Sequence, residues 1–138
     1  MIKITIPGKP VPKERMTHNQ VIAATRYNAP GKKFDRIRKC LEYQKAIAAL
    51  CCNKRIKGNV KMTARIYLKP DATGQLPKQR GDLDNYIKSI KDGLQYGVVF
   101  APQGKNKAGN DKCVIRYGEG TGIYSDENER VEIELVEV

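Results

Sequence analysis

Three stretches of the chain alternate between apolar and polar residues, which is the pattern of strands that bury one face. The clearest covers residues 60–68 and stops at Pro70. Residues 1–6 and residues 131–135 show the same alternation. A fourth apolar segment, residues 112–117, is also typical of a strand. We therefore predict four strands.

Two other stretches repeat their apolar residues at helical spacing. Residues 33–53 form a long amphipathic pattern whose outer side is basic. Residues 84–96 form a second pattern, in which Asp84 is predicted to cap the N-terminus and Gly97 to end the helix. The chain thus alternates between strands and helices.

The segments between these elements show no sustained period. Residues 16–33 are rich in Asn, Gly and Pro and are interpreted as a long loop, and residues 118–122 as a Gly-rich turn. The order of elements predicts an α/β (α+β) domain with a small four-stranded mixed sheet packed with two main helices. A length of 138 residues fits a single domain over residues 1–138.

The charge of the chain indicates what kind of partner it binds. The formal net charge is +11, and residues 1–70 hold 17 Lys and Arg against 3 Asp and Glu, whereas residues 71–138 hold 9 against 12. An excess of this kind attracts polyanions, above all nucleic acid. Four cysteines without a C-x-x-C pair and a single histidine argue against a zinc site. With no apolar run of about 18 residues and no apolar signal region at the N-terminus, we expect a cytoplasmic protein.

Most of the basic side chains that could contact a sugar-phosphate backbone precede or open the first helical pattern. In residues 8–15 two prolines stiffen the chain into an extended form. The candidates are Lys9, Lys13 and Arg15 in this segment, Arg26, Lys32 and Lys33 further on, and Arg80 in the loop before residue 81. A solvated surface is the alternative interpretation of each.

The candidate chemistry lies at Asp82 and Asp84, two residues apart. If this segment is extended, both carboxylates point to one face. Hard oxygen ligands of this kind bind Mg²⁺, or Mn²⁺. Lys88, one helical turn after Asp84, could pair with it or stabilise charge on a phosphate. Asn85 is a further candidate for a DNA contact. The alternative is that Asp84 only caps a helix.

A third carboxylate would complete a metal site. Asp111 is the best candidate, because it opens a predicted strand that could return to the same edge of the sheet. Asp92 is a weaker one, since eight residues past Asp84 it lies ~12 Å further along the helix axis. The predicted catalytic set is therefore Asp82, Asp84, Asp111 and Lys88.

Two motifs together resemble the RusA family of Holliday junction resolvases. They are Asp82-Leu83-Asp84-Asn85-x-x-Lys88, followed by an Asp near the next strand, and the opening Ile6-Pro7-Gly8-Lys9-Pro10-Val11-Pro12-Lys13-x-Arg15. The resemblance implies a RusA-like fold and a Mg²⁺-dependent endonuclease that acts as a homodimer on four-way DNA junctions in recombination and repair. Such proteins often come from phages or prophages. The family's three metal-binding aspartates correspond to Asp82, Asp84 and Asp111, and its essential lysine to Lys88.

Three functional hypotheses are consistent with the sequence. The first is a dimeric crossover junction endodeoxyribonuclease. The second is a non-catalytic basic module that binds nucleic acid, in which Asp84 is only a cap and Lys88 its ion-pair partner. The third is a nuclease for flaps or other branched substrates.

Overall fold

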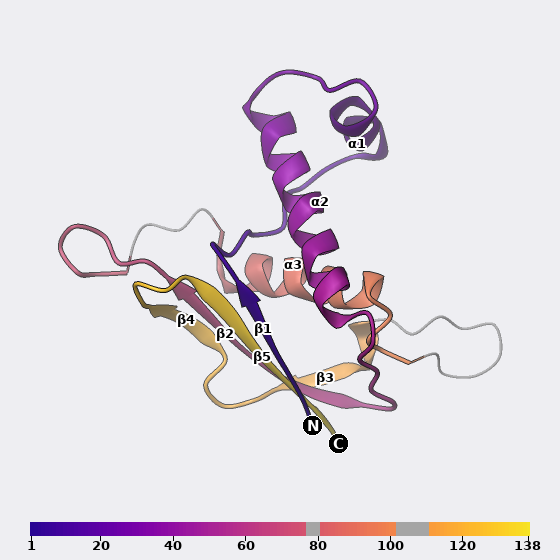
Figure 1. Ribbon diagram of the computed structural model, residues 1–138, viewed down its shortest axis with the longest axis vertical. Helices are drawn as coiled ribbons and strands as arrows, with labels where there is room; N and C mark the ends of the chain where they lie inside the picture. The colour runs from indigo at the N-terminus through magenta and orange to yellow at the C-terminus, as the bar shows by residue number, and fades with distance from the viewer. Residues whose placement is uncertain (77–80, 102–110) are drawn as a thin grey trace.

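The computed structural model describes residues 1–76, 81–101 and 111–138, and a five-stranded mixed sheet forms its centre (Figure 1). The strands are β1 (Ile2–Pro7), β2 (Val60–Leu68), β3 (Val114–Tyr117), β4 (Gly122–Ser125) and β5 (Arg130–Glu137). β5 lies between β1 and β2 and is antiparallel to both. β3 and β4 pair in parallel with the other edge of β2. The predicted fold class, an α and β domain around a small mixed sheet, is confirmed, but the sheet has five strands and not the four predicted.

One face of the sheet is apolar because the strands alternate in register with one another. Ile4 of β1 is opposite Ile133 of β5, which is opposite Ala64 of β2, and all three are buried. The other face is polar, and there Arg65 and Glu134 form an ion pair at 3.9 Å. The apolar face must therefore be covered by other elements.

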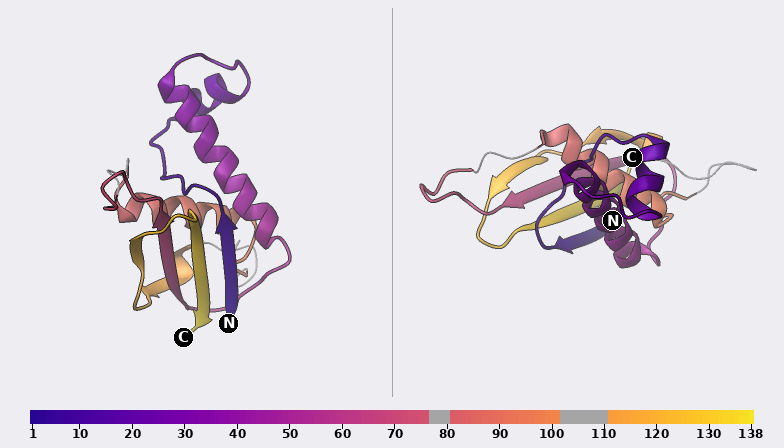
Figure 2. Two further views of the ribbon diagram at one scale, coloured as in Figure 1. Left: turned by 60° about the vertical axis from the view of Figure 1, so that its left-hand side comes forward. Right: turned by 90° about the horizontal axis from the view of Figure 1, so that it is seen from above.

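Two helices, α2 (Lys32–Cys51) and α3 (Leu83–Tyr96), cover the apolar face (Figure 2). Their buried side chains form one hydrophobic cluster with those of the strands. The two helices also approach each other closely, since a Cβ at Gly93 of α3 would lie 2.7 Å from the Cβ of Ile47 of α2. Gly97 follows the last residue of α3, as predicted, and it packs against the backbone of Ala48. The C-terminal half of α3 is thus held closely against α2 above the sheet.

A third helix, α1 (His18–Thr25), occupies part of residues 16–33, so the prediction of a loop there was wrong. Thr17 Oγ1 accepts a hydrogen bond from the backbone N–H of Gln20 at 3.2 Å, and Gln20 Oε1 accepts one from the N–H of Thr17 at 2.9 Å. This reciprocal cap stabilises a helix start, but eight residues are too few for a helical period to stand out. α1 packs against the N-terminal half of α2 beyond the edge of the sheet (Figures 1 and 2). We call residues 18–39 the projection.

The segment predicted as a Gly-rich turn also differs, because it continues along β2 and includes β4. The backbone N–H of Gly118 donates to the carbonyl of Met62 at 2.9 Å. A Cβ at position 118 would lie only 2.0 Å from Oγ1 of Thr63, so glycine allows this close approach. The segment before β3 begins with a short 3₁₀ turn, η1 (Asp111–Cys113), rather than with the strand that was predicted from residue 112. Within the part of the chain that the structure describes, no helix is both long and apolar enough to cross a lipid bilayer.

Candidate active site and nucleic-acid interface

The two neighbouring carboxylates lie at the N-terminus of α3, where Asp82 rather than Asp84 is the cap. Oδ1 of Asp82 accepts a hydrogen bond from the backbone N–H of Asn85 at 3.0 Å. The prediction that Asp84 caps the helix was therefore wrong, and its carboxylate lies in the first turn, exposed to solvent. Both carboxylates are close to the positive end of the helix dipole, which is a favourable position for an acidic side chain. Asp84 thus does not cap the helix, which was the alternative to a role in metal binding.

Lys88 follows one turn after Asp84 and is also exposed. Among the ion pairs of the described residues, none joins Lys88 to Asp84. The Lys88 ammonium is therefore available to a ligand on the surface of α3.

The basic segment of residues 12–15, which we call the strap, lies directly against the start of α3. The backbone N–H of Lys13 donates to the carbonyl of Asn85 at 2.9 Å. Its ammonium forms an ion pair with Asp92 at 2.8 Å, two turns along the helix from Asn85. A Cβ at Gly81 would lie 2.7 Å from the Cβ of Pro12, so the chain before α3 also touches the strap. Two motifs about 70 residues apart in sequence thus form one surface.

Glu14 holds the other side of the strap to α2. Its Oε1 lies 3.1 Å from Nζ of Lys33 and 3.3 Å from Nε of Arg36. Lys33 Nζ also donates to the backbone carbonyl of Arg15. Partial burial by itself raises the pKa of Glu14, but the hydrogen bonds from Lys33 and Arg36 outweigh it and leave the pKa below its ordinary value. The strap is therefore tied to both helices by charged groups.

A groove of about 510 Å³ lies between the strap and α3, and we call it the strap–α3 groove. It is lined by Pro12, Lys13, Glu14, Arg15, Met16, Gly81, Asn85 and Lys88. Arg15 and Lys88 are its exposed cations. Gly81 and Asn85, which also line the groove, are the residues directly before Asp82 and directly after Asp84 in the sequence.

Asp111 lies in η1, which packs against α3. Its carboxylate is 3.9 Å from the ammonium of Lys91, and the same ammonium is 3.2 Å from the hydroxyl of Tyr117. Over residues 1–76, 81–101 and 111–138, no group of three His, Cys, Asp or Glu side chains lies close enough to hold a metal ion. The structure therefore brings Asp111 to the flank of α3 without assembling three carboxylates around one point.

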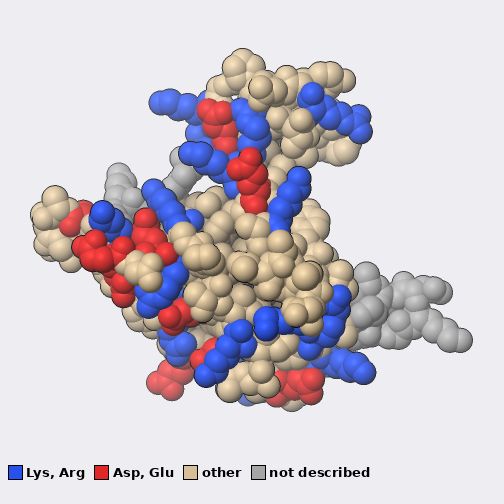
Figure 3. All heavy atoms as spheres, in the orientation of Figure 1, with Lys and Arg blue, Asp and Glu red and all other residues tan. Residues whose placement is uncertain are grey.

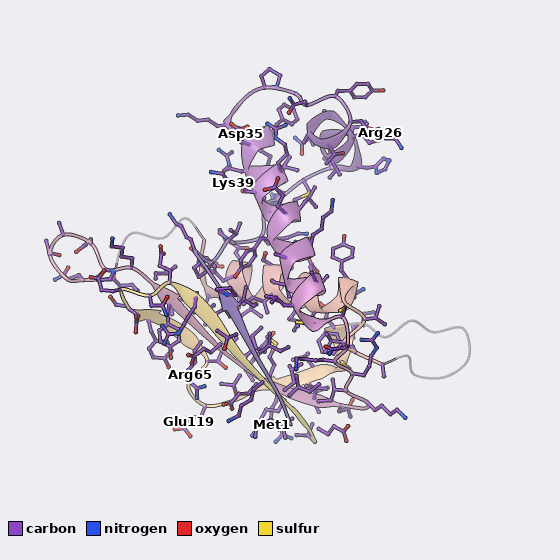
Figure 4. All side chains as sticks on the ribbon, viewed as in Figure 1. Met1, Arg26, Asp35, Lys39, Arg65 and Glu119 are labelled. Carbon is purple, nitrogen blue, oxygen red and sulfur yellow. The ribbon has the colours of Figure 1, made fainter. Side chains whose placement is uncertain are left out.

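The other basic candidates lie mainly on the projection. Arg26 follows α1 and is exposed at the outer end (Figure 4), and Lys32 is the exposed first residue of α2. Lys9 is exposed just before the strap. Basic side chains are prominent on this part of the surface (Figure 3). Arg80 lies outside the described residues.

Sequence reasoning missed the anchoring residues Asp92, Glu14 and Arg36. The spacing of these residues in the sequence does not predict their ion pairs, because each pair joins two separate elements of the structure. The only local signal was that Asn85, Lys88 and Asp92 share one face of α3, at intervals of three and four residues.

Residues 7–136 match the model of the family described as endodeoxyribonuclease RusA. The chain belongs to the RusA family. The match includes the strap, α3 and η1, so the RusA assignment covers every described part of the candidate site. A comparison of the chain with curated proteins found no match. RusA proteins are endodeoxyribonucleases, so this chain belongs to a family of DNA-cleaving enzymes.

Proposed function

We propose that this protein is a Mg²⁺-dependent endonuclease that resolves four-way DNA junctions, with Asp82, Asp84 and Asp111 as metal ligands and Lys88 as the cation beside the scissile phosphate. The observation that carries the proposal is the strap–α3 groove, which places exposed Arg15 and Lys88 beside the start of α3. A cationic groove attracts a DNA strand, and adjacent carboxylates repel one unless a divalent cation lies between them. Belonging to the RusA family supports this proposal.

The donor atoms at the start of α3 fit a hard divalent cation. Asp84 is exposed, and Asp82 uses only Oδ1 in capping the helix. Carboxylate oxygens with water completing the shell are the ligands that Mg²⁺ prefers, and Mn²⁺ accepts the same set. Asp111 would join them by exchanging its contact with Lys91 for the metal. When bound, such an ion lowers the pKa of a coordinated water and neutralises phosphate charge.

The side chains of the chain itself have separate tasks in this proposal. Lys88 stabilises the negative charge that develops on the phosphate during hydrolysis. Arg15 and Lys9 hold the sugar-phosphate backbone beside the groove, with Asn85 at its edge. Arg26 and Lys32 on the projection contact a more distant part of the DNA. Lys13 and Lys33 act through the strap that they anchor.

Resolution of a junction requires two cuts in opposed strands, and each chain offers one such groove at the start of α3. We therefore propose that the protein acts as a homodimer. Its place of action is where recombining DNA is found, in the cytoplasm of a bacterial or phage-infected cell.

The test is cleavage of a synthetic four-way junction by the wild type and by Asp82→Asn over a range of Mg²⁺ concentrations. Asparagine caps helices about as well as aspartate, so the variant should fold and bind the junction while losing cleavage. Asp126→Asn is the matched control, because Asp126 also accepts a backbone hydrogen bond, from Asn128 at 2.8 Å, in the connection between β4 and β5.

Full cleavage by Asp82→Asn in Mg²⁺ would refute the proposed metal site. Binding without nicking by the wild type in any divalent ion would instead favour a non-catalytic module. Duplex and flap DNA tested side by side with the junction show which branched structure is preferred.

A further inference from the structure

A second and larger cavity, of about 850 Å³, lies on the other side of the strap. Its walls come from the strap, the middle of α2, the end of β2 and the start of α3. Pro12 and Glu14 line both this cavity and the strap–α3 groove, so the strap separates two adjoining spaces. A volume of this order falls within the range, about 300–1,000 Å³, of sites that bind small ligands.

The inner wall of the cavity is apolar and aromatic. It includes Val11, Leu68 and the two tyrosines Tyr43 and Tyr86, of which Leu68 and both tyrosines are buried. A planar ring of moderate size could pack against such a wall, as bases do on aromatic side chains. The cavity thus offers an apolar surface directly beside the proposed path of a DNA strand.

Tyr43 provides an unused polar group at this wall. Its side chain is only 9% exposed, and its hydroxyl has no hydrogen-bond partner in the described part of the chain. Burial raises the pKa of Tyr43, and nearby Tyr86 raises it further, so the hydroxyl stays protonated and can donate a hydrogen bond at every physiological pH. Buried hydroxyls are normally paired. This one is enclosed behind the cavity wall, so a ligand would pair with it only after the Tyr43 ring turns toward the cavity.

The rim of the cavity carries Lys9, Lys39 and Lys69, all exposed and without an ion pair among the described residues. Lys39 lies on α2 above the sheet, as the last residue of the projection (Figure 4). Arg36 and three carboxylates, Glu14, Glu42 and Glu129, also line the cavity, so its charged side chains are four cations and three anions. An apolar pocket with one buried hydroxyl and a cationic rim matches a nucleotide, whose base is planar and whose phosphates are anionic.

We propose that this cavity binds one unstacked nucleobase of the DNA strand that passes along the strap–α3 groove. Tyr43 donates a hydrogen bond to the edge of the base, and Lys9, Lys39 and Lys69 face the flanking phosphates. The inference rests on the proposed function, because it requires DNA as the substrate. Bases at the crossover of a junction suit it, since unpaired or poorly stacked bases leave a duplex at the lowest energetic cost.

The experiment measures binding of fluorescent DNA to the full chain without divalent ions, so that no cleavage occurs. A four-way junction and a single strand of about twelve nucleotides are each made with one abasic position, moved stepwise past the crossover or along the strand. Tyr43→Phe removes only the hydroxyl. We expect it to weaken binding of intact DNA by about threefold to tenfold, the range for one hydrogen bond. On DNA that lacks the bound base it should have no further effect, because the two losses remove the same contact.

The matched control is Tyr67→Phe, on the polar face of the sheet, where the hydroxyl contacts Glu132 at 3.5 Å. It should bind intact and abasic DNA like the wild type. Tyr43→Phe should unfold in urea at the same or a higher concentration than the wild type, because it deletes a buried hydroxyl that has no partner.

The possible outcomes separate the two proposals. If the wild type cleaves junctions but the effects of Tyr43→Phe and of every abasic position simply add, the nucleobase site is refuted and the nuclease function stands. If the coupling is present on single strands but junctions are neither preferred nor cleaved, the nucleobase site stands and the junction function is refuted. Failure to bind either DNA refutes both.

Discussion

The ammonium of Lys13 lies 2.8 Å from the carboxylate of Asp92, and this ion pair joins the basic strap to the second half of α3. Both side chains are about one-third exposed, at 30% each. Lys13 also donates a backbone hydrogen bond to Asn85, so the strap contacts α3 at two points along the helix. We therefore propose that Lys13, which the sequence offered as a phosphate contact, acts as a positioning residue for the groove that contains Arg15 and Lys88.

This role makes a prediction for the salt dependence of DNA binding. Each phosphate contact contributes about −0.9 to the slope of the logarithm of the binding constant against the logarithm of salt concentration. Lys13→Met and Asp92→Asn should leave that slope unchanged, whereas Arg15→Met should reduce it by about one contact. Lys13→Met and Asp92→Asn should each cleave DNA about tenfold to a hundredfold more slowly than the wild type, because small displacements in a reactive site have large effects.

Exchange of the two charges, Lys13→Asp with Asp92→Lys, should restore part of the cleavage rate. Tighter DNA binding and a steeper slope in Asp92→Asn would contradict this role, since they would mean that Asp92 withholds Lys13 from a phosphate.

The ion pairs of Glu14 predict an acid-sensitive contribution to stability. Since hydrogen bonds from Lys33 and Arg36 lower the pKa of Glu14 in the folded protein, ionised Glu14 stabilises the fold above its ordinary pKa of 4.5. That contribution declines as the pH falls below this value and is lost once the pH passes below the lowered pKa of the folded state. Glu14→Gln should lower the free energy of unfolding at pH 7 by about 1 kcal/mol and should flatten its dependence on pH in the acid range.

The measurement is urea unfolding between neutral and acid pH. Glu137→Gln, an exposed change at the end of β5, is the control and should follow the wild type. An equal difference between Glu14→Gln and the wild type at every pH would show that charge at Glu14 is not the cause.

The contact between Gly81 and Pro12 predicts that a single methyl group disturbs the groove. Gly81→Ala would place its Cβ 2.7 Å from the Cβ of Pro12, too close for two carbon atoms, so the strap must move. We expect a loss of stability of about 1–3 kcal/mol, as in other overpacked sites, and a reduced cleavage rate. Gly122→Ala is the control, because the nearest atom to its Cβ is 3.8 Å away, in the ring of Tyr124. A fully active and stable Gly81→Ala would mean that the strap tolerates displacement.

Asp111 lies beside Lys91 and could act either as a metal ligand or only as the ion-pair partner of Lys91. The substitution Asp111→Asn distinguishes these two roles. If Asp111 is a metal ligand, Asp111→Asn abolishes cleavage at ordinary Mg²⁺ and recovers partly at high Mg²⁺ or Mn²⁺, while junction binding persists. If it only pairs with Lys91, cleavage by Asp111→Asn and by Lys91→Met should fall alike and should not respond to the metal. We expect the first result, measured as cleavage rate against metal concentration, with binding followed separately.

The sequence alone determined the elements whose signal is local. The alternation over residues 60–68 predicted the bounds of β2, and the spacing of apolar residues predicted α2 and α3 to within one or two residues. The two motifs that resemble RusA led to the family that the family match then confirmed. Each of these signals lies within about twenty consecutive residues, where period and spacing reflect the environment of neighbouring side chains.

Tertiary structure decided which distant residues meet. The position of β4 depends on Gly118 passing over Thr63, and α1 depends on its packing against α2, so neither has a strong period of its own. The pairing of Lys13 with Asp92 depends on how the strap crosses α3. Such contacts depend on the path of the whole chain, and a charged side chain looks the same in sequence whether it faces solvent, DNA or an opposite charge.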